Sequence, residues 1–121
     1  MRNIGIAGFG TVGQGFFSQI NKNFKNFKVI QIAVKNVKKK RKINLKNIKV
    51  TSKVQELAIN PNIQVLVECI GGSSGAAYKL VKTAIENKKH IITANKALLA
   101  IHGNELVKLA EKNNVSISYE A

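Results

Sequence analysis

A short apolar run that leads directly into spaced glycines is the feature that most constrains this chain. The sequence IGIA at positions 4–7 is followed by GFGTVG at positions 8–13, and Val12, Phe16 and Ile20 then recur at helical spacing. A strand, a glycine turn and a helix in this order are the required setting of the GxGxxG motif. The first glycine permits a tight turn, the second lets a pyrophosphate approach the backbone, and the third lets helix and strand pack closely. The stretch therefore predicts dinucleotide binding at a helix N-terminus, where free N–H groups and the helix dipole favour phosphate.

The rest of the chain continues the alternation of strands and helices. Further strands are expected at 27–34, 48–51, 65–70, 90–93 and 115–119, because these segments are short and rich in Val and Ile. Helices are expected at 54–59, where Pro61 ends the pattern, and at 98–113, with Gly103 as a break between a short turn and a longer helix. One more helix is expected from an apolar stripe at Ala77, Leu80, Val81, Ala84 and Ile85. This order predicts an α/β fold, a Rossmann-type doubly wound parallel sheet that forms a single nucleotide-binding domain over residues 1–121.

Length and composition exclude several classes of protein. A chain of 121 residues fits one domain, and no apolar stretch approaches the 18 residues of a membrane span. The N-terminus also lacks the layout of a signal peptide. The single cysteine, Cys69, lies in an apolar strand, so we expect a small buried side chain and a reducing, cytoplasmic environment.

The positive charge is unevenly distributed. The net charge is +14, and residues 1–55 contain 13 of the 20 Lys and Arg residues but no acidic residue. A basic half of this kind is typical of proteins that bind nucleic acid, a membrane surface or a phosphorylated ligand. A/T-rich codon usage, which favours Lys, Ile and Asn, is a second explanation of the general excess.

The end of the second strand bears on the choice of cofactor. The fingerprint ordinarily places an acidic residue there, which binds the ribose 2′-hydroxyl of NAD. Here the strand ends at Val34, the next residues are KNVKKKRK at 35–42, and no acidic residue occurs before Glu56. Lysines attract a 2′-phosphate and a carboxylate repels it, so the sequence predicts NADP(H) in preference to NAD(H). A solvated basic loop without a ligand is the alternative interpretation.

Three later segments, in this order, carry a family resemblance. These are VECIGG at 67–72, TANKALLAIHG at 93–103 and YEA at 119–121, and together with GFGTVG they closely resemble the nucleotide-binding domain of homoserine dehydrogenase. The resemblance covers the whole chain and implies reduction of aspartate semialdehyde to homoserine with NAD(P)H, on the route to threonine and methionine. It also implies a cytoplasmic enzyme that is a homodimer when full length. The sequence itself has no RNA-binding aromatic motif, zinc-finger pattern or membrane span, so we expect no nucleic acid or membrane as partner.

The resemblance also implies site residues. It implies that Lys96 lies beside the nicotinamide and the substrate, as a tentative catalytic residue that could donate to a carbonyl or move a proton. Thr93 and Asn95 are expected to line the same pocket, and Lys35 matches a position that is often basic. The expected cofactor-binding residues are Gly8, Gly10, Thr11, Val12, Gly13, Lys35, Gly71, Thr93, Asn95 and Lys96.

Other features leave alternatives open. His90 and His102 lack metal-ligand spacing, so we expect no metal site. Glu68 is either a hydrogen-bonded structural acid or a residue that faces the cofactor. Ser73 and Ser74 replace a segment that contains proline in many relatives. In the family a substrate domain follows the last strand, so the chain is expected to lack it, leaving an apolar patch or an open edge at that strand. A non-catalytic NADP-binding module or a basic nucleic-acid binder remains an alternative, although only 6% of residues are aromatic.

Overall fold

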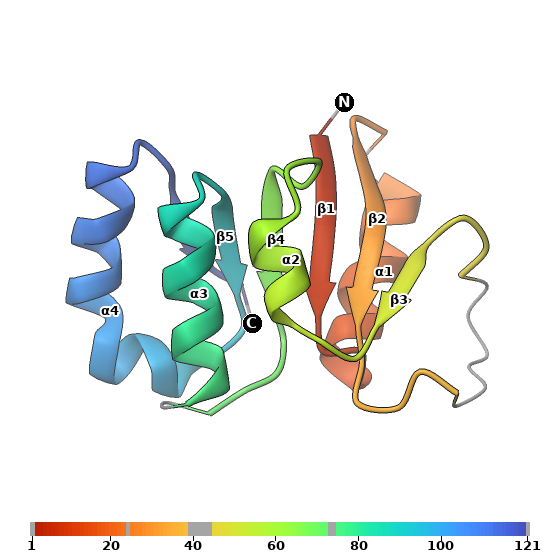
Figure 1. Cartoon of the computed structure of the whole chain (residues 1–121), viewed down its shortest axis with the longest axis horizontal. Helices are drawn as coiled ribbons and strands as arrows, with labels where there is room; N and C mark the ends of the chain where they lie inside the picture. The colour runs from red at the N-terminus through yellow and green to blue at the C-terminus, as the bar shows by residue number, and fades with distance from the viewer. Residues whose placement is uncertain (1, 24, 39–44, 73–74, 121) are drawn as a thin grey trace.

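One parallel sheet organises the molecule (Figure 1). A computed structural model describes residues 2–23, 25–38, 45–72 and 75–120 of the chain. In this part of the chain a six-stranded sheet has the order β3-β2-β1-β4-β5-β6, with every neighbouring pair parallel. The strands are β1 (Arg2–Ala7), β2 (Phe27–Ala33), β3 (Lys49–Thr51), β4 (Val65–Glu68), β5 (His90–Thr93) and β6 (Ile117–Tyr119). The predicted doubly wound Rossmann sheet is confirmed.

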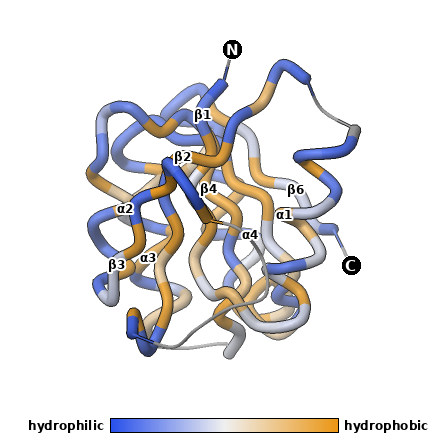
Figure 2. The backbone as a smooth tube through the Cα atoms, turned by 90° about the vertical axis from the view of Figure 1, so that its right-hand side faces the viewer, coloured by the Kyte–Doolittle hydropathy of each residue, from blue (hydrophilic) through white to orange (hydrophobic). Residues whose placement is uncertain are grey.

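Helices cover both faces of this sheet. They are α1 (Thr11–Asn23), α2 (Gln55–Ile59), α3 (Ala76–Glu86) and α4 (Lys96–Lys112). Helix α1 packs on one face, and α2, α3 and α4 pack on the other (Figure 1), so the described core consists of two hydrophobic clusters on opposite faces of the sheet. Figure 2 shows hydrophobic residues concentrated along the central strands and hydrophilic ones in the peripheral turns. This arrangement leaves the carboxyl ends of all strands at one edge of the domain.

The two helices that were predicted from apolar stripes differ in how well the stripe locates the buried face. In α3 all five predicted apolar residues are at most 1% exposed. In α1 the spacing is helical as predicted, but the buried face is shifted by one residue. Phe17 and Ile20 are buried, whereas Val12 is 49% exposed. The shift follows from Gly13, which must face the Gly8 turn because no side chain fits there.

The predicted break at Gly103 is wrong, because α4 is continuous from Lys96 to Lys112. A glycine inside a helix costs about 1 kcal/mol relative to alanine. Burial of flanking apolar side chains outweighs this cost, since Leu98 and Leu106 are fully buried on the same side of the helix. Packing therefore decides the helix length.

Four strands are shorter than predicted, β2 and β3 by one residue each and β4 and β6 by two. Strand β6 begins at Ile117 and not at Val115, because the Val115 amide donates to the Ala110 carbonyl at the end of α4. Strand β4 ends at Glu68, because the Ile70 amide turns to the Glu68 side chain. β6 forms one edge of the sheet, as expected.

Candidate functional site

A groove of about 670 Å³ lies at the carboxyl ends of β1, β2, β3 and β4. It occupies the point where the strand order reverses between β1 and β4, which is where open α/β sheets bind ligands. The described residues that line it are Gly8, Phe9, Gly10, Ala33, Val34, Lys35, Asn36, Ser52, Val54, Cys69, Ile70, Gly71 and Ala76.

The three glycines of the fingerprint have different surroundings. Gly8 has a φ of +92°, and a Cβ there would lie 2.7 Å from the Cys69 carbonyl oxygen. A Cβ on Gly13 would lie 2.1 Å from the Gly8 carbonyl oxygen. A Cβ on Gly10 would meet no described atom within 4 Å. Gly8 and Gly13 are therefore required by the turn and its packing, whereas Gly10 faces open space in the groove.

Helix α1 begins directly after Gly10. The Gln14 side chain donates to the Phe9 carbonyl at 3.0 Å, and the Gln14 amide donates to the Gly10 carbonyl at 2.9 Å, so the loop is tied to the first helical turn. No acidic residue lies in that turn. The first N–H groups of a helix have no intrahelical acceptor, and the dipole makes this end positive. The arrangement suits an anion such as a pyrophosphate.

One basic residue, Lys35, is among the described residues that line the groove. Lys35 follows β2, is exposed and lines the groove beside Asn36, whose Oδ1 accepts from the Lys38 amide at 3.0 Å. No carboxylate is among the described lining residues. The remaining basic residues of the predicted cluster, Lys39, Lys40, Arg41 and Lys42, lie outside the described residues, as do Ser73 and Ser74.

The loops after β4 and β5 are joined by buried hydrogen bonds. Glu68 is fully buried and accepts from the Thr93 hydroxyl at 2.5 Å. Asn95 Nδ2 donates to the Gly72 carbonyl, and Asn95 Oδ1 accepts from the Leu98 amide, which caps α4. Lys96 is the exposed first residue of that helix. Of the two alternatives for Glu68, the structure shows the hydrogen-bonded one.

The predicted site residues therefore fall into three groups. Gly8, Gly10, Lys35 and Gly71 line the groove. Thr11, Val12 and Gly13 form the first turn of α1 beside it. Thr93, Asn95 and Lys96 are not among the lining residues, although Thr93 and Asn95 are linked through Glu68 and Gly72 to the Gly71 loop.

Ser52 and Val54 line the groove but were not predicted from the sequence. They follow β3, and the rule that ligands bind beyond the carboxyl ends of strands is the signal that points to them.

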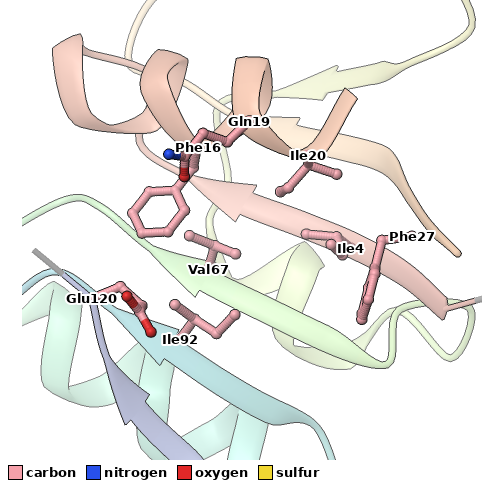
Figure 3. A pocket seen from close by; sticks show the side chains of 8 residues that line it. All are labelled: Ile4, Phe16, Gln19, Ile20, Phe27, Val67, Ile92 and Glu120. Carbon is pink, nitrogen blue, oxygen red and sulfur yellow. The ribbon is translucent and has the colours of Figure 1, made fainter. Parts of the chain in front are cut away.

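A second, apolar groove of about 230 Å³ lies on the α1 face of the sheet (Figure 3). Phe16, Gln19 and Ile20 of α1 stand over one side, and residues of four strands with Glu120 complete it. Its lining is almost entirely hydrocarbon, with no basic side chain among the described lining residues. It therefore does not suit a dinucleotide.

Other titratable groups are explained by local structure. Burial, with a smaller contribution from Glu68, raises the pKa of Cys69 to about 12. Burial lowers the pKa of Lys89, whose Nζ donates to the carbonyls of Asn60 and Ile63 at 2.6 and 2.8 Å. His90 contacts Ser116, and His102 Nδ1 lies 3.7 Å from Glu105 Oε1.

Within the described ranges, no group of three or more His, Cys, Asp or Glu side chains could hold a metal ion. None of the helices in these ranges has the length and apolar character of a membrane span.

Comparison with known proteins agrees with this geometry. Residues 8–120 match the family model described as homoserine dehydrogenase, NAD binding domain. The chain is 40% identical to the homoserine dehydrogenase of Pseudomonas aeruginosa and 33% identical to that of Bacillus subtilis, in each case over 98% of its length. It covers only 28% and 29% of those proteins.

Solved structures give the same result. A crystal structure of homoserine dehydrogenase from S. aureus superimposes with a TM-score of 0.89, at 37% identity, over 99% of this chain and 32% of that one. A putative oxidoreductase from Klebsiella pneumoniae, at 21% identity and a TM-score of 0.80, shares the fold. The chain therefore belongs to the homoserine dehydrogenase family and matches its NAD-binding domain.

Proposed function

We propose that the chain binds NADP(H), with NAD(H) as the weaker ligand, and forms the cofactor-binding part of a homoserine dehydrogenase. The reaction is the interconversion of L-aspartate 4-semialdehyde and L-homoserine in threonine and methionine biosynthesis. The observation that carries the proposal is the open space beside Gly10. Of the three fingerprint glycines, Gly10 alone faces such space in the groove. A bound pyrophosphate would occupy this space, next to the N-terminus of α1.

Lys35 supports the preference for NADP(H). It lines the groove after β2, where an NAD-binding site ordinarily has a carboxylate. A hydrogen bond to a charged group contributes about 1.5–3 kcal/mol. One such bond to the 2′-phosphate corresponds to at least tenfold tighter binding of NADPH than of NADH.

The nicotinamide end of the site is assigned to the Gly71 loop and the start of α4. A bound nicotinamide supplies hydride transfer. Lys96 begins α4 at the carboxyl end of β5, where its ammonium group could donate to a substrate carbonyl. Thr93 ends β5 and Asn95 caps α4, and the Asn95 side chain donates to the Gly72 carbonyl.

The activity of the whole enzyme depends on more than this domain. The chain spans under a third of the length of its curated relatives. We propose that substrate orientation, a homodimeric state and a cytoplasmic location belong to the full-length enzyme. Hydride transfer requires that the substrate be held against the nicotinamide. The 121-residue chain is therefore expected to bind cofactor without oxidising homoserine.

The test is calorimetric titration of the chain with NADPH and with NADH. NADPH is expected to bind at least about tenfold more tightly. Lys35→Ala should weaken NADPH binding and leave NADH nearly unchanged, whereas Lys108→Ala, which removes the same charge from the exposed side of α4, should change neither. Equal affinities for the two cofactors, or a Lys35→Ala variant with an unaltered ratio, would show that the preference is wrong. Failure of both cofactors to bind would overturn the proposed function itself.

A further inference from the structure

Glu68 is a buried carboxylate at the end of β4 that connects two loops. It is 0% exposed, and both of its oxygens accept hydrogen bonds. Oε1 accepts from Thr93 Oγ1 at 2.5 Å, and Oε2 accepts from the backbone amides of Ile70 and Gly71, each at 2.9 Å. Thr93 is also the register partner of Glu68 on β5. One side chain thus holds the start of the Gly71 loop and the end of the neighbouring strand.

The hydrogen bonds continue from Thr93 to the start of α4. Thr93 Oγ1 accepts from the Asn95 amide at 3.0 Å. Asn95 Nδ2 donates back to the Gly72 carbonyl at 2.5 Å, and Asn95 Oδ1 caps α4 by accepting from the Leu98 amide at 3.0 Å. Two of these hydrogen bonds, from Thr93 to Glu68 and from Asn95 to Gly72, join the loop after β4, which lines the groove, to the turn that carries Lys96.

A carboxylate determines the direction of these hydrogen bonds. An ionised carboxylate only accepts, so Thr93 must donate to it and is left with a lone pair for the Asn95 amide. The amides of Ile70 and Gly71 must point into the protein, and Gly71 and Gly72 adopt φ values of +81° and +87°. Burying such a charge is costly unless it is fully hydrogen-bonded. Stability alone favours an apolar residue inside a strand, so the carboxylate points to a role in shaping the loops.

We propose that Glu68 is a positioning residue that sets the geometry of the nicotinamide end of the cofactor site. This inference rests on the proposed cofactor binding. Glu68 touches neither cofactor nor substrate. It holds the Gly71 wall and the N-terminus of α4 in one arrangement, and so places Lys96 relative to the nicotinamide.

The proposal predicts that a change at Glu68 affects one end of the ligand and not the other. In Glu68→Gln the amide NH2 group must face either the Thr93 hydroxyl, which then loses its acceptor, or the Ile70 and Gly71 amides, which then both lose theirs. Titration with NADPH, followed by its own fluorescence, reports the nicotinamide end. Titration with 2′-phospho-ADP-ribose, which lacks nicotinamide, reports the adenine end.

For wild-type chain we expect both ligands to bind, and NADPH fluorescence to increase. Glu68→Gln should abolish most of that increase and weaken NADPH binding about tenfold, while the affinity for 2′-phospho-ADP-ribose stays within about twofold. Glu86→Gln, on the exposed end of α3, is the matched control and should change nothing. Thr93→Val should reproduce the effect of Glu68→Gln, and Thr93→Ser, which keeps the hydroxyl, should behave as wild type.

Several results would overturn the proposal. Equal weakening of both ligands by Glu68→Gln would show that Glu68 only stabilises the fold. An unchanged NADPH signal would show that it does not position the nicotinamide end. If Glu68→Gln does not fold, the fluorescence of bound NADPH is compared between Thr93→Val and Thr93→Ser. Equal nicotinamide signals in these two variants would reject the proposal. A wild-type chain that binds 2′-phospho-ADP-ribose without any nicotinamide signal rejects this inference but leaves cofactor binding intact. A chain that binds neither ligand rejects both.

Discussion

Single alanine substitutions at Gly10, Gly13 and Gly15 separate the glycine that admits the cofactor from the glycine that shapes the fold. Gly10 and Gly13 belong to the fingerprint. Gly15 lies two residues further along α1, is exposed, and has no neighbouring atom of the described residues within 4 Å of an added Cβ. The three variants carry the same added methyl group. Gly13 and Gly15 both lie inside α1, so the difference between these two variants reports the surroundings of that group.

The structure gives the expected magnitudes. In Gly13→Ala the new Cβ would lie 2.1 Å from the Gly8 carbonyl oxygen, which is a backbone atom and cannot rotate away. Overpacking of this kind costs about 1–3 kcal/mol of unfolding free energy. In Gly10→Ala the methyl group meets no described atom within 4 Å, and φ at Gly10 is outside the left-handed region, so stability should change by less than about 1 kcal/mol. Gly15→Ala should stabilise the chain by about 0.5–1 kcal/mol.

Cofactor binding should follow a different order. The Gly10 methyl group would occupy the space of the pyrophosphate, so Gly10→Ala should weaken NADPH binding at least about tenfold, or 1.4 kcal/mol. Gly15→Ala should bind NADPH like wild type. Urea denaturation and fluorescence titration of the same samples give both quantities. A folded Gly10→Ala variant with wild-type affinity would refute the assignment of the groove, and a Gly13→Ala variant as stable as wild type would refute the packing argument.

Three further predictions concern Lys89, Gly103 and Cys69. Lys89→Met should cost about 1–3 kcal/mol, because the carbonyls of Asn60 and Ile63 lose their donor. The pKa of Lys89 is lowered in the folded state, so the folded chain binds this proton less readily than the unfolded chain. Wild type should therefore gain stability relative to Lys89→Met as pH rises toward 10.5, the ordinary lysine pKa. A difference in unfolding free energy between the two proteins that stays constant with pH, measured by urea denaturation, would contradict this. Gly103→Ala should raise the unfolding free energy by about 0.5–1 kcal/mol, because alanine has the higher helix propensity. The added Cβ would lie 3.8 Å from the Leu99 Cβ, which is an ordinary contact. A loss of stability would instead support a break in α4. Cys69, with its pKa raised to about 12, should react with a thiol reagent at least about a hundredfold more slowly in the folded than in the urea-unfolded chain at pH 8, and equal rates would show an accessible thiolate.

The sequence predicts those parts of the fold that depend on local pattern. The stripe of α3 locates its buried face because five small and medium apolar residues repeat at helical spacing. The alternation of strands and helices likewise predicts a parallel sheet, because a helix between two strands returns the chain to the end of the sheet where the first strand began. In both cases the pattern along the sequence carries the information.

Other features depend on contacts between distant segments, and the sequence alone does not determine them. Glycine at position 103 predicts a break in the helix because helix propensity is a local property of the residue. The burial of Leu98 and Leu106, in contrast, depends on packing against α3 and the sheet. The two alternatives for Glu68 are decided by Thr93, a residue 25 positions away that only the β4–β5 pairing brings close. Ser52 and Val54 likewise join the groove through the pairing of β3 with β2.

The proposed function requires that NADP(H) bind at the carboxyl ends of β1 and β2. The most direct measurement is NMR of ¹⁵N-labelled chain during titration with NADPH. Amide shifts are expected at Gly8, Gly10, Lys35 and Gly71, with no change at Phe16 and Ile92 in the apolar groove. Saturating NADPH that leaves the four groove amides unshifted, or that shifts those of Phe16 and Ile92 in their place, would contradict the claim.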